Sequence, residues 1–277
     1  MLHLIYKKPI FAPMSKFSFH SVLIALAVLL TQCSGFQKTL NKGKPEEQYK
    51  MASELFGQGK YGRAIQLFEK IIPFYRGKPQ MERIQYMYSM ANYEEKNYLI
   101  SGYHFERFTK NFPRSTKREE AMYLAAMSYY LSTPKSSLDQ TDTQKAIDAF
   151  QRFIDNYPES NKVKEANKYI RLLEQRIEKK EFDIAYQYYH TGQYKAAIVA
   201  FDNFISEHLG TKYKEDALYY KAKSAYLLTK NSVESKIPER AAKALKALNR
   251  VLRNYPGTEY KKDIESMINE LNKLPKK

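Results

Sequence analysis

The sequence has little of what catalysis or disulfide bonding requires. It contains a single cysteine, Cys33, so no disulfide can form within the chain. Its five histidines are scattered and lack a partner at the spacing of a metal site. No glycine-rich phosphate loop, nucleophile elbow or His-Glu-x-x-His motif is present. We therefore expect a protein that is not an enzyme, with no catalytic residues, no metal and no cofactor.

Long apolar runs are also scarce. The most apolar stretch, residues 22–30, follows Lys16 and has nine residues, which is too short to span a bilayer comfortably and typical of a signal-peptide core. Leu30-Thr31-Gln32-Cys33 comes next. This stretch resembles a bacterial lipoprotein signal, whose final motif is Leu, a small residue, Gly or Ala, then Cys; Gln32 departs from that pattern.

The resemblance implies that residues 1–32 are a signal peptide and that Cys33 becomes a lipid-bearing N-terminus, acylated by chains such as palmitate. Two or three acyl chains would hold the protein firmly on a membrane. Ser34 is not the acidic residue that retains many lipoproteins in the inner membrane, which favours the outer membrane. Residues 33–46 contain Gly, Lys and Asn and are predicted to form a flexible tether.

Acidic residues are outnumbered. The formal charge is +16, and removal of residues 1–32 leaves +13 because that segment holds three lysines and no acid. Such a charge favours acidic partners, anionic lipid or nucleic acid. No arginine-rich stripe or nucleic-acid motif is present. We interpret the charge as a solvated basic surface and expect no nucleic-acid partner.

What the chain does have is a repeat. A small residue recurs at spacings of 37, 37, 59 and 37, and a second small residue recurs further on, followed after four and seven positions by large apolar residues. These offsets place the recurring residues on one face of a helix. The five sets are Ala52, Ala64, Phe68 and Ile71; Ser89, Ser101, Phe105 and Phe108; Ala126, Ala146, Phe150 and Phe153; Ala185, Ala197, Phe201 and Phe204; Ala222, Ala244, Leu248 and Val251.

The residues that end one helix and begin the next also recur. Asn156-Tyr157-Pro158-Glu159-Ser160 shows the pattern in which Pro ends one helix and Ser or Thr caps the next. Gly59-Lys60-Tyr61 and Gly192-Gln193-Tyr194 place glycine at a helix C-terminus. These residues resemble the tetratricopeptide repeat, which implies an all-α solenoid of about five helix–turn–helix repeats across residues 47–260.

The repeats are expected to form two halves. Residues 47–160 would hold repeats one to three, and residues 161–277 would hold repeats four and five. The spacing of 59 leaves room for extra helix, so one long helix of roughly 27 residues is predicted from residue 162 onward. A polar loop is expected inside the third repeat, at residues 132–143, and another inside the fifth, at residues 229–238.

The first helices of the first three repeats carry many aromatic residues on the side that a tetratricopeptide array turns toward its groove. Tyrosine offers apolar area and a hydroxyl, and methionine offers adaptable contact, so this side is predicted to bind an extended peptide. The alternative is that the same rings fill the core between repeats. The candidate groove residues are Tyr49, Phe56, Tyr86, Met90, Tyr93, Tyr123, Met127 and Tyr130.

Three features of the sequence together narrow the choice of protein family. The lipoprotein motif directly precedes the array, the third repeat has a long loop, and a run from Glu165 leads into Tyr188-Tyr189-His190-Thr191-Gly192-Gln193-Tyr194. In these features the chain resembles the BamD family, lipoproteins of the outer-membrane β-barrel assembly machinery. The resemblance implies a scaffold on the periplasmic side of the outer membrane. Its partners would be a BamA-like barrel insertase, other assembly lipoproteins and unfolded outer-membrane proteins.

The family contacts its insertase mainly through the C-terminal half. From the helix register, Tyr219, Lys223 and Tyr226 are our candidates for that contact. A tetratricopeptide protein of cell division or envelope maintenance, similar to the division coordinator CpoB, is the main alternative. A nutrient-binding lipoprotein and a cytoplasmic regulator are further alternatives, which the short loops and the signal segment respectively disfavour.

Overall fold

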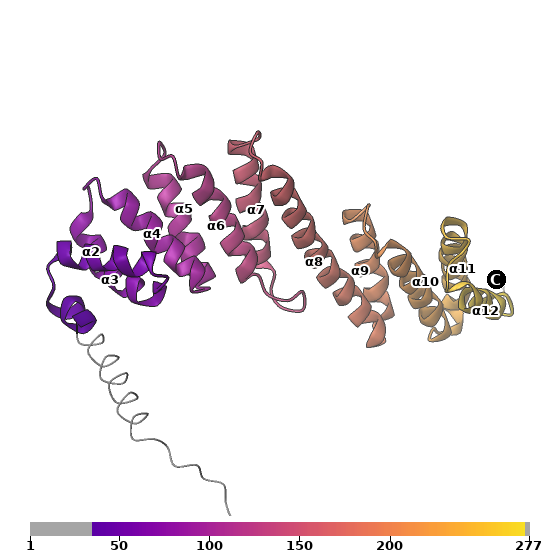
Figure 1. The fold of residues 1–277 in the computed structure, drawn as a ribbon. Coiled ribbons are helices and arrows are strands. Elements are labelled where there is room, and N and C mark those ends of the chain that lie inside the picture. The colour runs from indigo at the N-terminus through magenta and orange to yellow at the C-terminus, as the bar shows by residue number, and fades with distance from the viewer. Residues whose placement is uncertain (1–34, 275–277) are drawn as a thin grey trace, which may run out of the picture. The chain divides into compact units, whose positions relative to one another are not determined.

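The computed structural model describes residues 35–274, and no residue in that range lies in a β-strand (Figure 1). Residues 35–42 are helical. The elements that follow are α2 (Pro45–Gly57), α3 (Tyr61–Tyr75), α4 (Met81–Glu94), α5 (Tyr98–Asn111), α6 (Arg118–Ser132), α7 (Thr141–Asn156), α8 (Val163–His190), α9 (Tyr194–Glu207), α10 (Lys214–Lys230), the short 3-10 helix η1 (Glu234–Lys236), α11 (Ile237–Asn254) and α12 (Lys261–Asn272). The predicted all-α class is confirmed.

The helices form two compact units, which we describe separately. The first unit ends at Ser115 and contains α2 to α5, and the second begins at Thr116 and contains α6 to α12. Within each unit, helices that follow one another in the chain pack side by side (Figure 1). The third helix pair, α6 and α7, therefore belongs with the C-terminal helices and not with the first two pairs.

The repeat register predicted from the sequence is confirmed by burial. All twenty recurring positions, from Ala52 and Ala64 to Leu248 and Val251, are at most 2% exposed. The small residues let the two helices of a pair approach closely, and the large residues fill the space between them. Each pair thus has its own layer of core, as expected of helical repeats that stack on their neighbours.

The long helix is also confirmed. Helix α8 runs without interruption from Val163 to His190, which is 28 residues or about 42 Å. Its first part packs through Ala166, Ile170 and Leu173 into the core that it shares with α6 and α7. Its last part packs through Phe182 and Ala185 against α9 and α10. One helix therefore takes part in two separate layers of core.

The segment before α2 differs from the prediction of a flexible tether. Residues 35–42 are helical, and Phe36 and Leu40 are buried in the core of the first unit. The Gln48 side chain donates hydrogen bonds to the carbonyl oxygens of Thr39 and Leu40, at 3.1 Å each. Composition suggested a tether, but two apolar residues four positions apart share a helix face and give the segment a core to join.

The hydroxyl groups in the turns between helix pairs act in a slightly different way from the predicted helix caps. Ser160, Thr211 and Thr258 each accept a hydrogen bond from the backbone N–H two residues later. The residues that immediately precede α8, α10 and α12 are Lys162, Tyr213 and Tyr260, which cap through no side chain. The hydroxyls thus stabilise a turn that leads into the helix, because the turn is longer than the sequence suggested.

The turns inside the helix pairs contain a site for a stabilising substitution. Gly59 and Gly192 have φ values of +70° and +76°, and Lys96 occupies the same place in the second pair at +61°. A side chain is strained in this left-handed conformation, whereas glycine is not. We expect Lys96→Gly to raise the free energy of unfolding by about 0.5–1 kcal/mol, as measured by urea denaturation.

Gly192→Ala provides the reciprocal test of this prediction. No atom lies within 4 Å of the Cβ that alanine would add, so the variant isolates the backbone strain. It should lower the free energy of unfolding by about 1 kcal/mol. If Lys96→Gly lowered stability instead, the larger conformational entropy that glycine loses on folding would outweigh the relief of backbone strain, contrary to our expectation.

Candidate functional site

The first helices of neighbouring pairs touch one another, as well as touching their own partners. In the first unit α2 contacts α4, and in the second unit α8 contacts both α6 and α10, while α10 contacts α12. Side chains on this side of the first helices lie near those of the next pair. This arrangement is the one required for the predicted peptide-binding groove.

In the first unit, the five predicted groove residues are all half-buried. Four of them are aromatic, and their rings pack edge-on or tilted against aromatic residues of the second helix of the same pair. The ring centroids of Tyr49 and Tyr75 lie 5.6 Å apart, those of Phe56 and Tyr61 5.4 Å, those of Tyr86 and Phe108 5.6 Å, and those of Tyr93 and Tyr98 5.7 Å; Met90 lies between Tyr86 and Tyr93 on α4.

In the second unit, the three predicted residues on α6 differ in how deeply they are buried. Tyr123 is only 9% exposed and belongs to the core, with its ring 5.4 Å from that of Phe153. Met127 and Tyr130 are half-buried, and the Tyr130 ring lies 4.5 Å from that of Tyr169 on α8. Tyr169 was not among the predicted residues, although its place on the apolar face of the long helix could have indicated it.

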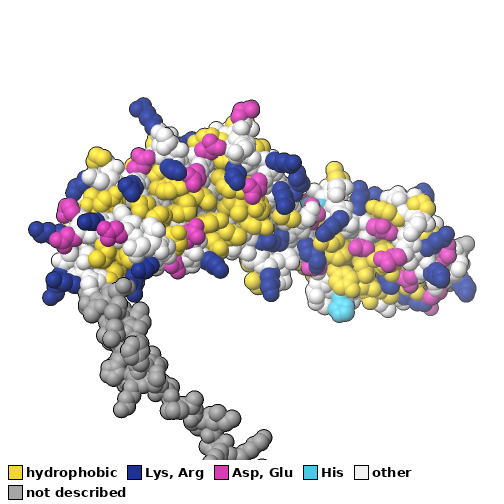
Figure 2. Space-filling view, in the orientation of Figure 1, with side chains coloured by type: hydrophobic (Ala, Val, Ile, Leu, Met, Phe, Trp, Pro, Cys, Tyr) yellow, Lys and Arg dark blue, Asp and Glu magenta, His cyan; other side chains and the backbone are white. Residues whose placement is uncertain are grey.

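These rings therefore have one side in the core and, except for Tyr123, another side toward solvent. Figure 2 shows that hydrophobic side chains gather on the visible face of each unit, bordered by charged residues of both signs. Rings held in this way lose little conformational freedom when a ligand covers them. Peptide binding by these residues stays a prediction.

The predicted partner residues on α10 are engaged with α12. The Tyr219 hydroxyl donates a hydrogen bond to the Asp263 carboxylate, and Lys223 Nζ lies 2.9 Å from the Tyr219 hydroxyl and 3.0 Å from Asp263 Oδ2. The Tyr219 and Tyr260 rings stack with centroids 3.7 Å apart. Tyr219 is 4% exposed, so its side chain is a structural contact between α10 and α12.

The third predicted residue, Tyr226, makes a similar contact further along. Its hydroxyl donates a hydrogen bond of 2.6 Å to Glu270 Oε2, which Lys230 also contacts at 2.9 Å. Tyr226 and Lys223 are half-buried. The three predicted residues thus lie together on the side of α10 that faces α12, and Lys223 and Tyr226 keep part of their surface accessible.

The α10–α12 contacts perturb the acid–base behaviour of their members. Burial and the hydrogen bond to Asp263 raise the pKa of Tyr219 to about 12. Burial alone would lower the pKa of Lys223, but its hydrogen bonds to Tyr219 and Asp263 outweigh that effect and raise the pKa. Burial alone would raise the pKa of Asp263, but the bonds from Tyr219 and Lys223 outweigh it and hold the pKa below its ordinary value.

Because the folded pKa of Asp263 is lowered, its stabilising contribution is present above the unfolded pKa of about 3.9 and is lost as the pH falls through the folded pKa. Asp263→Asn should therefore be less stable than the parent near neutral pH, by about 1 kcal/mol or less because the carboxylate is nearly half exposed. The two proteins should converge in acid. Urea denaturation between roughly pH 6 and pH 2.5 measures the difference.

Glu265→Gln is the control for this prediction. It removes one carboxylate from the same helix without removing a contact to α10, so it corrects for the change in net charge. A stability difference between Asp263→Asn and its parent that stayed constant down to the acid end of the series would contradict a lowered pKa for Asp263.

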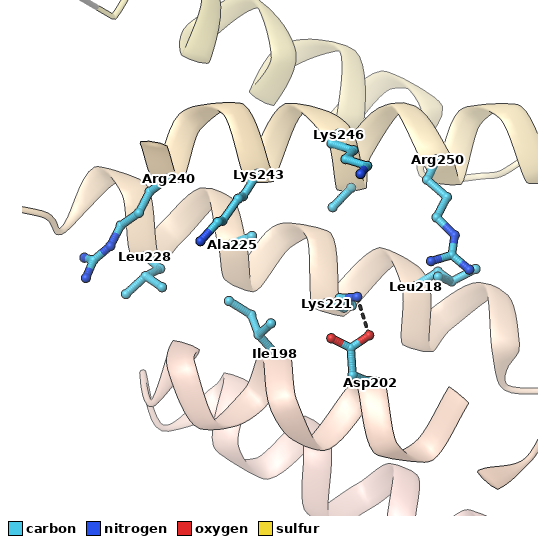
Figure 3. A pocket seen from close by; sticks show the side chains of 11 residues that line it. Ile198, Asp202, Leu218, Lys221, Ala225, Leu228, Arg240, Lys243, Lys246 and Arg250 are labelled. Carbon is cyan, nitrogen blue, oxygen red and sulfur yellow. Dashed lines mark hydrogen bonds and ion pairs between the residues drawn. The ribbon is translucent and has the colours of Figure 1, made fainter. Parts of the chain in front are cut away.

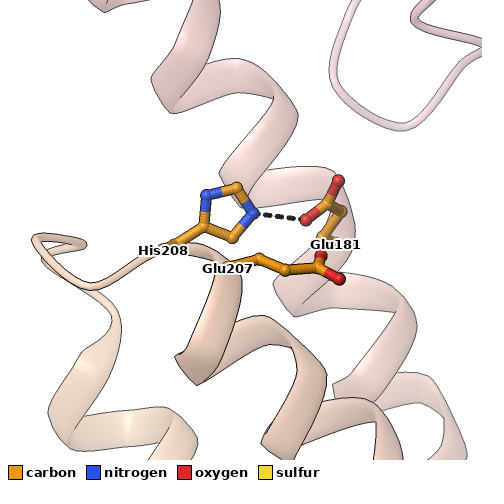
Figure 4. A group of neighbouring side chains, drawn as sticks. All are labelled: Glu181, Glu207 and His208. Carbon is orange, nitrogen blue, oxygen red and sulfur yellow. Dashed lines mark hydrogen bonds and ion pairs between the residues drawn. The ribbon is translucent and has the colours of Figure 1, made fainter.

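A cluster of possible metal ligands lies where α9 ends. The Glu181 and Glu207 carboxylates and the His208 imidazole place ligand atoms within 4.8 Å of one another (Figure 4). Sequence analysis did not predict this group, because Glu181 and His208 are 27 positions apart in the chain. His208 Nε2 interacts directly with Glu181, and its ring packs 5.1 Å from that of Phe204. We interpret the cluster as a contact that holds the end of α9 against α8.

The predicted lipidation residue, Cys33, lies outside the described residues. Among the helices of residues 35–274, none combines the length and the apolar character that crossing a bilayer requires. Membrane attachment through Cys33 thus stays a prediction from the sequence.

Comparison with known proteins finds a matching family model and several relatives. A family model described as YfiO, outer membrane lipoprotein, matches residues 41–186 and 174–275. A protein of Aquifex aeolicus, provisionally named outer membrane protein assembly factor BamD, is 26% identical over 257 residues, which cover 90% of this chain and 81% of that protein.

Two further relatives are named outer membrane protein assembly factor BamD. The Caulobacter vibrioides protein is 25% identical, over 78% of this chain and 71% of its own length. The Rickettsia prowazekii protein is 26% identical, over 75% of this chain and 83% of its own length. Because the family model spans nearly all of the described helices, this chain belongs to the YfiO, or BamD, family of outer membrane lipoproteins.

Proposed function

We propose that this protein is a non-enzymatic scaffold of the outer-membrane β-barrel assembly machinery. The observation that carries the proposal is the match of the family model to residues 41–186 and 174–275, together with relatives that are named assembly factors. In this role the protein is anchored by a lipid on Cys33, on the periplasmic side of the outer membrane. It binds a BamA-like insertase, other assembly lipoproteins and unfolded outer-membrane proteins.

The decisive experiment is affinity purification of a C-terminally tagged copy from detergent-solubilised envelopes, followed by mass spectrometry. A barrel protein with periplasmic repeat domains, recovered in near-stoichiometric amount, is the expected result. Recovery of peptidoglycan or cell-division proteins without an insertase would overturn the proposal and favour the CpoB-like alternative. Cys33→Ser tests the anchor in the same preparation, because the protein should then leave the membrane fraction.

We further propose that unfolded clients bind along the first helices of the pairs. Two properties support this: half-buried rings line these helices, and neighbouring first helices lie against each other within each unit. An extended strand of a membrane β-barrel protein alternates apolar and polar side chains and carries aromatic residues near its ends, which such rings can contact. Phe56 and Met90 are the best test residues, since each keeps part of its side chain accessible.

A synthetic C-terminal peptide of a β-barrel protein, labelled for fluorescence anisotropy, measures this binding. We expect Phe56→Ala and Met90→Ala each to weaken binding by about tenfold or less, the scale of one aromatic or apolar contact. Phe74→Ala is the matched control, because Phe74 is 58% exposed on a second helix, α3. Equal losses for Phe56→Ala and Phe74→Ala would show that the peptide does not select the first helices.

For the insertase we propose a contact that includes Lys223 and Tyr226, with Tyr219 positioning α12 beside them. The proposal is supported by the accessible part of Lys223 and Tyr226 and by their place in the C-terminal pairs. Tyr226→Ala should reduce recovery of the insertase in the purification above. Glu270→Gln retains the Tyr226 ring while weakening its hydrogen bond, and so separates loss of the ring from loosening of α12.

A further inference from the structure

A second surface of the C-terminal pairs has a different chemistry. Helix α10 lies between α9 and α11, and side chains of all three line a cavity of about 410 Å³ (Figure 3). The apolar lining comes from α9, α10 and α11 and consists of Ile198, Leu218, Ala225, Leu228 and Ala247. We call this site the α11 groove. On α10 the groove is lined by Leu218, Lys221, Ala225 and Leu228, which share one face of the helix. That face is rotated by about 100° around the helix axis from the face that holds Tyr219, Lys223 and Tyr226.

The α11 groove is strongly basic. Arg240, Lys243, Lys246 and Arg250 come from one face of α11 and line the groove (Figure 3). Lys221 adds a fifth cation, and Asp202, the single acid in the lining, is ion-paired with it. The groove therefore keeps a net positive charge next to apolar surface.

The cations of α11 are weakly engaged within the protein. Lys243 pairs with Glu239, but both side chains are about 70% exposed, so that pair contributes little. Arg240 donates a hydrogen bond to the Ser232 hydroxyl. Lys246 and Arg250 are exposed and have no ion-pair partner in the described part of the chain. Lys246 and Arg250 are therefore available to pair with an incoming negative ligand, and Lys243 can exchange its exposed partner for one.

The arrangement of the charges indicates the shape of that ligand. From Arg240 to Arg250 is ten residues, or about 15 Å along α11, with a cation at nearly every turn. Cations that bind one phosphate converge on one point, whereas these are spread along a row. Carboxylates on one face of a helix repeat at the same interval of three or four residues. The apolar lining offers a place for the neighbouring face of such a helix.

We propose that the α11 groove binds an acidic amphipathic helix of a partner protein. The acidic residues of that helix pair with the α11 cations, and its adjacent apolar residues cover Ile198 and Leu228. A second copy of this chain is a poor occupant, because the formal charge of +13 that remains without residues 1–32 makes two copies repel each other. The proposal goes beyond the assembly role, because it assigns a partner chemistry to a face of α10 that the proposed insertase contact does not use.

The test uses the whole chain reconstituted in phosphatidylcholine nanodiscs and a designed, stapled helical peptide. The peptide carries Glu at positions i, i+3 and i+7 and Leu on the adjacent face, with a fluorophore for anisotropy. We expect binding that weakens with added salt, because surface ion pairs are screened. The double variant Lys246→Glu with Arg250→Glu should weaken it by tenfold or more, and Leu228→Ala by about threefold.

Lys38→Glu with Lys42→Glu is the matched control, because it makes the same charge change at exposed residues of the first unit. It should leave peptide binding within twofold of the parent. An equal loss in this control, or equal binding of a peptide with the same composition in scrambled order, would show attraction by overall charge only and overturn the proposal.

A second arm distinguishes protein from lipid as the occupant. The peptide titration is repeated in nanodiscs that contain phosphatidylglycerol. Peptide binding that persists supports a helical protein partner. Peptide binding that is abolished by the anionic lipid, together with protection of α11 amides from hydrogen exchange by that lipid in the parent but not in Lys246→Glu with Arg250→Glu, would assign the groove to lipid head groups and overturn the proposal.

Discussion

Phe201→Ala is expected to lower the free energy of unfolding of the second unit by about 3–5 kcal/mol, the range observed when a buried phenylalanine is truncated. The Phe201 side chain is fully buried in the layer where α8, α9 and α10 meet. Its ring lies 5.8 Å from that of Phe182 and 6.3 Å from that of Tyr220. These rings belong to three helices that cannot close the space without breaking their own contacts, so the cavity should persist.

Two variants make this result interpretable. Phe201→Leu keeps most of the apolar volume and should cost much less than Phe201→Ala. Val199→Ala lies two residues away on α9 but is 59% exposed, and should change the free energy of unfolding by no more than about 0.5 kcal/mol. Urea denaturation monitored by circular dichroism gives all three values. A cost below about 1 kcal/mol for Phe201→Ala would mean that the helices collapse onto the cavity, contrary to the expected rigidity of this layer.

Glu178→Pro is expected to cost about 3 kcal/mol or more and to divide the unfolding of the second unit into two steps. Residue 178 lies between the part of α8 that packs with α6 and α7 and the part that packs with α9 and α10. Proline removes one backbone hydrogen bond and clashes with the carbonyl oxygen four residues earlier. It therefore interrupts the element that takes part in both layers of core.

Glu178→Ala is the control, because alanine removes the same side chain and favours helix. It should retain a single transition and a stability close to that of the parent. Thermal melts followed by circular dichroism, together with hydrogen exchange of α7 and α9, separate one transition from two. A single transition in Glu178→Pro would show that the loops and side-chain contacts around α8 couple the two layers without a continuous helix. Arg176, which contacts the carbonyl oxygen of Pro134, is the first candidate for such coupling.

Much of the fold could be predicted from residue spacing. The small and large apolar residues at offsets of four and seven are all buried, from Ala64 and Phe68 to Leu248 and Val251. Their spacing is informative because a helix brings residues three and four apart to one face, and only one face of each helix meets its partner. The uninterrupted helical pattern after residue 162 likewise matched α8.

The predictions that failed or remained incomplete concern contacts between distant residues. Residues 35–42 looked polar by composition, but Phe36 and Leu40 join the core of the first unit. Tyr123 fits the groove register as well as Tyr130 does, yet only the structure shows that it is almost fully covered. The pairing of Glu181 with His208 depends on the turn between α8 and α9, which folds the two helices against each other and places residues 27 positions apart side by side.

The sequence by itself determined the class of fold, the register of the helix pairs and the family, because these depend on local periodicity and on short motifs at set spacings. Only the tertiary structure decided which surfaces remain available. It showed that Tyr219 is committed to α12, and that one face of α11 aligns four cations beside the apolar lining that α9, α10 and α11 share. The physical reason is that a side chain's accessibility depends on how neighbouring helices cover it, which the periodicity of a single helix does not specify.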